Sequence, residues 1–128
     1  MSRVVSRLTG IYDADGGVRG ELAYVVGRLR RTVHCGLCDI THSPVRRKRE
    51  WDAMVAGLGV PFDLLHRNEQ AMGSRFDGPL PAVLAEVDGE RVMLLDPVSL
   101  DRAEGDVRAF RAALQSALEA HALVLPAR

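Results

Sequence analysis

A β-hairpin between residues 82 and 95 is the feature that most restricts the fold of this chain. Two runs rich in valine and leucine, AVLAEV and RVMLL, flank the tripeptide Asp88-Gly89-Glu90. A glycine in so short a connection supplies the positive φ that tight hairpin turns require. The sequence therefore predicts an antiparallel strand pair at 82–87 and 91–95.

Apolar periodicity predicts further elements on both sides of the hairpin. Residues 7–14 and 60–66 are apolar, β-prone runs next to turn-forming residues, and they predict two more strands. Apolar residues at i, i+3, i+4 and i+7 predict helices over 22–29 and 51–58, and a similar stripe predicts a last helix over 107–118. Ser43 and Pro44 are suited to begin the second of these helices.

The order strand, helix, CxxC segment, helix, strand, hairpin, helix predicts an α/β fold with a single-layer mixed sheet and flanking helices. The length of 128 residues fits one domain, over 1–128.

Charge and hydropathy exclude some classes of partner. Seventeen basic and seventeen acidic side chains give a formal net charge of zero, which does not favour nucleic acid or a membrane surface. The N-terminal residues MSRVVSRLTG lack the apolar run of a signal peptide, and no stretch has the roughly 20 apolar residues of a membrane span. We therefore expect a cytoplasmic protein, in which a CxxC is catalytic or metal-binding rather than a structural disulfide.

Residues 34–42, HCGLCDITH, contain both cysteines and two of the four histidines of the chain. A thiolate is the nucleophile of thiol chemistry, and a helix N-terminus, nearby cations and the CxxC arrangement each favour its formation. The basic run 46–49 follows closely, near a predicted helix N-terminus where cations are unfavourable, so a compensating acid or anion is expected there. If residues 32–35 form a short strand, the CxxC lies at the carboxyl ends of the parallel strands, where α/β sites usually form. If they form a loop, it lies at the other end.

The second half of the chain resembles the thioredoxin-like superfamily. The CGLC motif at 35–38, a helix, the strand VPFDLLH, the Leu80-Pro81 step into the hairpin and a closing helix follow the order of that family from its active site onward. The resemblance covers about residues 35 to 120. It implies a single thioredoxin-like domain.

The resemblance implies roles for three residues. Cys35 would be the nucleophile, Cys38 the resolving thiol, and Pro81 a cis-proline that faces the dithiol. The substrate would be a thiol or disulfide of a protein or a small molecule, and no cofactor would be needed. The chain departs from the usual motif at His34 and Leu37, which replace an aromatic residue and a proline.

A second alignment with the same superfamily places the active site elsewhere. The stretch Tyr12-Asp13-Ala14-Asp15-Gly16 resembles the start of a motif that begins Tyr-Asp-Gly-x-Cys in one subgroup, although this chain has no cysteine there. On that alignment the HCGLC segment is an insertion, and the roles of Cys35 and Cys38 do not carry over.

The same cysteines also support a metal-site hypothesis. Zinc binds thiolate sulfur and imidazole nitrogen in tetrahedral sets, and CxxC is a common half-site. Cys35, Cys38 and His42 can converge on one ion, because positions four apart share a helix face. Copper(I) or iron would also suit thiolates, so the cofactor on this hypothesis is zinc or another thiophilic metal. The candidates for a fourth ligand are His34, His66 and His121.

Three functions therefore remain open: a thiol-disulfide oxidoreductase, a metal-binding protein, and a non-catalytic thioredoxin-like interaction module. Glycine-rich nucleotide-binding motifs are absent from the sequence.

Overall fold

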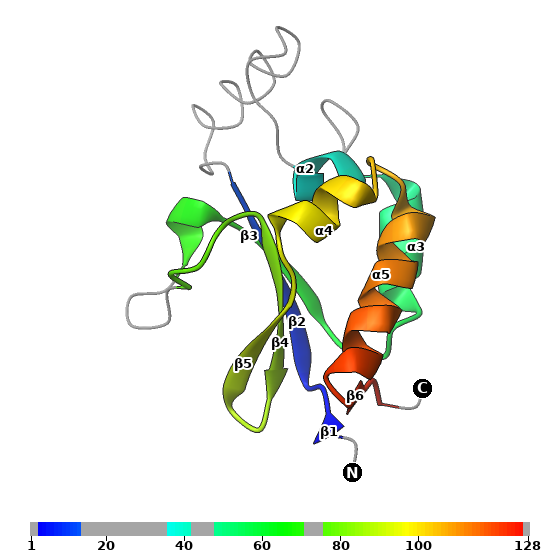
Figure 1. The fold of residues 1–128 in the computed structure, drawn as a ribbon. Helices are drawn as coiled ribbons and strands as arrows, with labels where there is room; N and C mark the ends of the chain where they lie inside the picture. The colour runs from blue at the N-terminus through cyan, green and yellow to red at the C-terminus, as the bar shows by residue number, and fades with distance from the viewer. Residues whose placement is uncertain (1–2, 14–35, 42–47, 71–75, 127–128) are drawn as a thin grey trace, which may run out of the picture.

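The structure is a computed structural model, and it describes residues 3–13, 36–41, 48–70 and 76–126. Its centre is a four-stranded sheet of the order β3-β2-β4-β5 (Figure 1). The strands are β2 (Arg7–Tyr12), β3 (Phe62–His66), β4 (Ala82–Val87) and β5 (Glu90–Leu95). Strand β2 pairs in parallel with β3 and antiparallel with β4, and β4 pairs antiparallel with β5. The fold is thus α/β with a mixed sheet, as the order of elements predicts.

The β4–β5 hairpin forms where the sequence predicts it. Its turn residues Asp88 and Gly89 have φ values of 53° and 80°. A turn with positive φ at both central residues matches the right-handed twist of the two strands. Glycine suits the second position because it adopts a positive φ without steric cost.

A register shift interrupts the pairing of β4 with β5. Val83 is opposite Leu95, but its neighbour Leu84 is opposite Met93, so Leu94 is an extra residue in β5. A bulge of this kind changes the direction in which side chains point. Leu94 and Leu95 consequently both belong to the main hydrophobic core, although adjacent residues of a regular strand point to opposite faces.

Helices pack on one face and at one end of this sheet. They are α2 (Gly36–Thr41), α3 (Arg49–Ala56), α4 (Pro97–Arg102) and α5 (Val107–Ala120). Helix α5 contacts α3 and β5, whereas α2 contacts α4 and β2 (Figure 1). The side chains of Asp96 and Asp106 cap α4 and α5 by accepting backbone N–H bonds of 2.8 and 3.1 Å.

The acid expected near the basic run is part of α3 itself. Lys48 is the N-cap residue of this helix and forms no side-chain capping bond, and Arg49 is its first residue. Glu50 and Asp52 lie in the first turn, where carboxylates favour the positive end of the helix dipole. The Nζ of Lys48 instead donates to the carbonyl of Gly105 at 2.5 Å.

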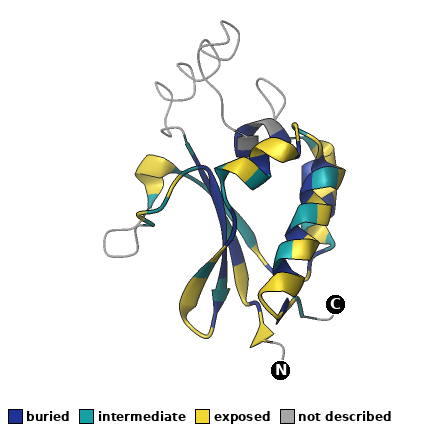
Figure 2. Cartoon of the chain, in the orientation of Figure 1, coloured by how far each residue is buried: buried dark blue, intermediate teal, exposed yellow. Residues whose placement is uncertain are grey.

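The main core lies between the sheet and the helices, and Figure 2 shows that the sheet-facing sides of the helices are buried. Trp51 of α3 is 2% exposed. Its ring centroid is 5.0 Å from that of Phe62 on β3 and 5.1 Å from that of Phe110 on α5. Edge-on and tilted aromatic contacts of this kind add to the energy of area burial, so these rings join three elements.

Most predicted elements are present with small changes of boundary. The strand expected over 7–14 ends at Tyr12, and the one expected over 60–66 begins at Phe62. The predicted helix over 22–29 and the Ser43-Pro44 helix start lie outside the described residues.

The structure also contains elements that the periodicity did not predict. Helix α4 is too short to show a helical repeat. The short strands β1 (Arg3–Val4) and β6 (Leu123–Val124) pair in parallel near the N-terminal end of β2. The 3₁₀ turn η1 (Arg67–Glu69) follows β3.

Replacing Gly10 by alanine is expected to lower the free energy of unfolding by about 1–3 kcal/mol, because the new methyl group overpacks the core. A Cβ at this position would lie 3.0 Å from side-chain atoms of Leu37 and Leu64 and 3.2 Å from Phe62. Gly57→Ala is the matched control, since its Cβ would meet nothing closer than 3.4 Å. Urea unfolding measures both changes. Equal stabilities of the two variants would show that Leu37, Leu64 and Phe62 do not pack tightly against Gly10.

Candidate functional site

Cys38 is the member of the CxxC pair that the structure describes. It lies in the first turn of α2 and is 6% exposed. Its neighbours Leu37 and Ile40 are fully buried in the main core. The helix therefore buries one face against the domain, and Cys38 lies on that face.

Two buried hydroxyl groups attach α2 to the central strand. The Oγ1 of Thr41 donates to the carbonyl of Cys38 at 3.4 Å, and it lies 2.8 Å from the hydroxyl oxygen of Tyr12. The two hydroxyl groups are therefore hydrogen-bonded to each other, and either can be the donor. Tyr12 is 3% exposed and Thr41 is fully buried, so both bonds are shielded from water.

These bonds fix the end of the sheet at which the CxxC helix lies. Tyr12 is the last residue of β2 and is paired with His66, the last residue of the parallel strand β3. Helix α2 is thus at the carboxyl ends of the parallel strands, where ligand sites of α/β proteins are usually built. This is the end at which a strand over residues 32–35 would put the CxxC, but residues 32–35 themselves lie outside the described residues.

Pro81 lies at the same end of the sheet. Strand β4 runs antiparallel to β2, and its first residue Ala82 is opposite Ile11, next to Tyr12. Pro81 is buried, and the Leu80–Pro81 peptide bond is cis. A cis bond is the geometry that the thioredoxin-like resemblance implies for this proline.

Polar side chains gather where β2 and β3 end. The Nδ1 of His66 lies 2.6 Å from Oε1 of Glu69, and the same oxygen accepts the backbone N–H of His66 at 2.7 Å. The ring of His66 also lies against Tyr12, with centroids 5.2 Å apart. Arg67 forms an ion pair of 3.3 Å with Asp13. This ion pair and the Tyr12–His66 contact join the ends of the two parallel strands.

The hydrogen bonds to Glu69 change its acidity. The backbone N–H of His66 is the main cause that holds the pKa of the Glu69 carboxyl below its ordinary value of 4.5, and the imidazole bond adds to it. The ionised carboxylate orients the His66 ring and caps η1.

The structure describes only some of the residues of the metal-site hypothesis. His34, Cys35 and His42 lie outside the described residues. Among the residues that are described, no group of three or more histidines, cysteines and acids could hold a metal ion. His66, a proposed fourth ligand, is bonded to Glu69.

The prediction that His121 is a candidate for the fourth metal ligand is wrong. It follows the last residue of α5, and the backbone of the next residue, Ala122, accepts the N–H of Arg3. Arg3 precedes the start of β2, whereas α2 lies beyond its end, so His121 and Cys38 are at opposite ends of the molecule (Figure 1). The two residues cannot share one ion.

Sequence reasoning missed the parts that Tyr12 and Thr41 play. In the sequence, Tyr12 stands out only as the start of a rival motif, and no pattern marks Thr41 as a site residue. One signal was available for Thr41, because a threonine three residues after a helical position can bond that carbonyl. Nothing in the sequence indicates that these two residues meet.

Comparison with protein-family models, curated proteins and solved structures gives no match for this chain. In the described part of the chain, no helix has both the length and the apolar character of a membrane span.

Tyr12→Phe is expected to lower the free energy of unfolding by about 0.5–1.5 kcal/mol, because it removes one buried hydrogen bond. Thr41→Val removes the same bond from the other side. If the bond attaches α2 to β2, the double variant loses less than the sum of the single variants, by about 0.5–1 kcal/mol. Urea unfolding of all four proteins measures this coupling, and strictly additive losses would contradict the arrangement.

Glu69→Gln is expected to destabilise the protein above pH 4.5 and to have little effect in acid. The folded state lowers the pKa of Glu69, so the carboxylate contributes stability above its unfolded pKa and loses it as the pH falls through the folded pKa. Unfolding free energies of both proteins between neutral pH and pH 3 measure the difference, with exposed Glu104→Gln as control. A difference that grows towards acid pH would contradict this assignment.

Proposed function

We propose that this chain is a thioredoxin-like thiol-disulfide oxidoreductase that uses Cys35 as nucleophile and Cys38 as resolving thiol. The observation that carries the proposal is the burial of Cys38 in the first turn of α2, at the carboxyl ends of β2 and β3. A resolving thiol works best when external disulfides cannot reach it but a neighbouring mixed disulfide can. Cys38 is 6% exposed, which supports the first condition, and its place three positions after Cys35 is the spacing of a CxxC redox pair, which supports the second.

The reaction has two exchange steps. The thiolate of Cys35 attacks one sulfur of a substrate disulfide, which forms a mixed disulfide and releases one substrate thiolate. Cys38, after losing its proton, attacks the sulfur of Cys35 and releases the second substrate thiol. The substrate disulfide gains two electrons, and the dithiol is oxidised to a Cys35–Cys38 disulfide. An external dithiol reductant returns the protein to its starting state.

The surroundings of α2 support this chemistry. Pro81, with its cis bond to Leu80, opens β4 at the same end of the sheet. In the thioredoxin-like superfamily, which the second half of the chain resembles, a proline in this place faces the dithiol. We propose the same role for Pro81, with a disulfide of a cytoplasmic protein or small molecule as substrate.

The rival alignment is an alternative to this proposal, because on it the HCGLC segment is an insertion and the roles of Cys35 and Cys38 do not carry over. It centres on the stretch that begins with Tyr12 and Asp13, which contains no cysteine. The Tyr12 hydroxyl is hydrogen-bonded to Thr41 in the last turn of the CxxC helix. Both alignments therefore concern the same end of the sheet.

Substitution of the two cysteines tests the proposal, because their roles are not equivalent. Cys35→Ser is expected to abolish reduction of a disulfide such as that of insulin. Cys38→Ala is expected to accumulate a mixed disulfide through Cys35, since the resolving thiol is missing. Alanine is preferred to serine here because Cys38 packs among apolar side chains. Mass spectrometry under acid quench detects the trapped adduct, and dithiothreitol should release it.

Two results would contradict the proposal. One is full reductase activity in Cys35→Ser, and the other is loss of a stoichiometric metal from His42→Ala with no change in thiol oxidation. The second result would assign the segment to metal binding instead. Circular dichroism of each variant shows that the fold is retained.

A further inference from the structure

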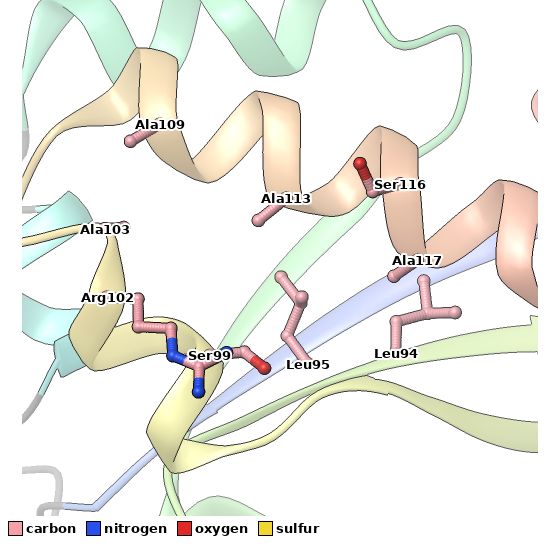
Figure 3. A pocket seen from close by; sticks show the side chains of 9 residues that line it. All are labelled: Leu94, Leu95, Ser99, Arg102, Ala103, Ala109, Ala113, Ser116 and Ala117. Atoms are coloured by element: carbon pink, nitrogen blue, oxygen red, sulfur yellow. The ribbon is translucent and has the colours of Figure 1, made fainter.

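The hollow between α4, α5 and β5, which Figure 3 shows, offers little to a ligand. Leu94 and Leu95 at its floor are 8% and 4% exposed, because the alanines of α5 pack over them. A polar group with unused hydrogen-bonding capacity lies instead at the carboxyl ends of β2 and β3, on the side chain of His66.

The imidazole ring of His66 is oriented by one carboxylate. Glu69 is ionised at neutral pH, because the backbone N–H of His66 holds the pKa of its carboxyl below the ordinary value. An ionised carboxylate only accepts hydrogen bonds, so Nδ1 of His66 is the donor in the 2.6 Å contact with Glu69. In the neutral ring Nε2 therefore carries the lone pair. No hydrogen bond to Nε2 is found in the part of the chain that the structure describes.

Tyr12 stands between this imidazole and the CxxC helix. Its ring lies against the ring of His66, with centroids 5.2 Å apart, and its hydroxyl oxygen is 2.8 Å from Oγ1 of Thr41. Thr41 and Cys38 are three positions apart and therefore share one side of α2, which is the side that Tyr12 contacts. His66 is thus one side chain away from the side of α2 that carries Cys38.

The neighbours of His66 on β2 and η1 leave imidazole as the group that exchanges a proton near neutral pH. The titratable and charged neighbours are Tyr12, Asp13, Arg67 and Glu69. Asp13 is paired with Arg67, and Glu69 is bonded to His66 itself. Carboxyl groups ordinarily ionise far below neutral pH and phenols far above it, whereas imidazole changes charge between about pH 5 and 8.

Cys38 needs a base when it resolves a mixed disulfide. It is 6% exposed and packs in the main core, and a thiol in apolar surroundings ionises less readily than an exposed one. We propose that His66 is the proton acceptor for Cys38, and that Glu69 is the positioning residue that holds its ring. This inference rests on the function proposed above and adds to it the destination of the proton.

The step balances without any further reactant. The Sγ–H bond of Cys38 breaks, and its proton moves to Nε2 of His66 directly or through one water molecule. The sulfur of Cys38 bonds to that of Cys35 while the bond between Cys35 and the substrate sulfur breaks, and the electron pair leaves with the substrate. The departing thiolate takes a proton from the imidazolium or from water.

Reaction of the reduced chain with dithiobis-nitrobenzoate, a disulfide that releases a coloured thiolate, separates the two exchange steps. Attack by Cys35 releases the first thiolate at a rate proportional to the reagent concentration. Resolution by Cys38 releases the second at a rate that does not depend on this concentration. In the unmodified chain the second rate is expected to fall about tenfold per pH unit in acid and to level off where the imidazole is uncharged.

His66→Gln is expected to slow the second phase about 100-fold at neutral pH and to leave the first phase unchanged. Its second rate should rise about tenfold per pH unit through the neutral range without a plateau, because only unassisted ionisation of Cys38 remains. His121→Gln is the matched control, since it makes the same substitution at the opposite end of the molecule (Figure 1) and should behave as the unmodified chain.

Glu69→Gln gives a second test that leaves His66 and both cysteines in place. The neutral amide no longer favours the charged ring, so the acid limb of the second phase is expected to move to lower pH. An acid limb that stays in place would contradict the proposed role of His66, even if His66→Gln does not fold.

The outcomes distinguish this inference from the function on which it rests. A plateau that persists in His66→Gln, at whatever rate, would overturn the inference alone, because a merely structural role lowers the rate without changing the shape of the pH profile. Equal slowing of both phases in that variant would also overturn it. An unmodified chain without the second phase would overturn the proposed function and this inference with it.

Discussion

Hydrogen bonding along both edges of β2 is the constraint on which the rest of the structure depends. Parallel pairing with β3 brings the last residues of the two strands, Tyr12 and His66, side by side. Antiparallel pairing with β4 brings Pro81 to the same place from the opposite chain direction. One central strand therefore brings two distant segments to its own carboxyl end. The hydroxyl of Tyr12 adds a third, because it bonds to Thr41 of the CxxC helix.

Packing along β2 complements its hydrogen bonds. A Cβ on Gly10 would lie 3.0 Å from Leu37, so the absence of a side chain there lets α2 approach the strand. Two residues later Tyr12 supplies the polar contact with the same helix. A close apolar contact and a buried hydrogen bond thus both hold the short helix α2 on β2. Such contacts are needed because isolated helices of a few residues are unstable in water. Burial of Cys38 follows from this attachment rather than from any property of the cysteine.

The sequence predicted the sheet better than it predicted the site. Strands, the hairpin and α5 follow from periodicity and from Gly89, since these signals are local. The bulge at Leu94 left no local signal, because it arises from pairing between strands. Likewise the meeting of Tyr12 with Thr41, 29 residues apart, depends on how α2 packs on the sheet. Only its residue type makes His121 a ligand candidate, and the topology separates it from α2.

The most direct test of the central claim is the intact mass of the freshly purified protein, with elemental analysis, before and after mild oxidation. A redox dithiol of Cys35 and Cys38 predicts a metal-free chain that loses two hydrogens on oxidation, regains them with a reductant, and accepts two alkyl groups only when reduced. A stoichiometric zinc or copper ion that shields both cysteines from alkylation would contradict the account. So would two thiols that remain reduced under an oxidant able to form structural disulfides.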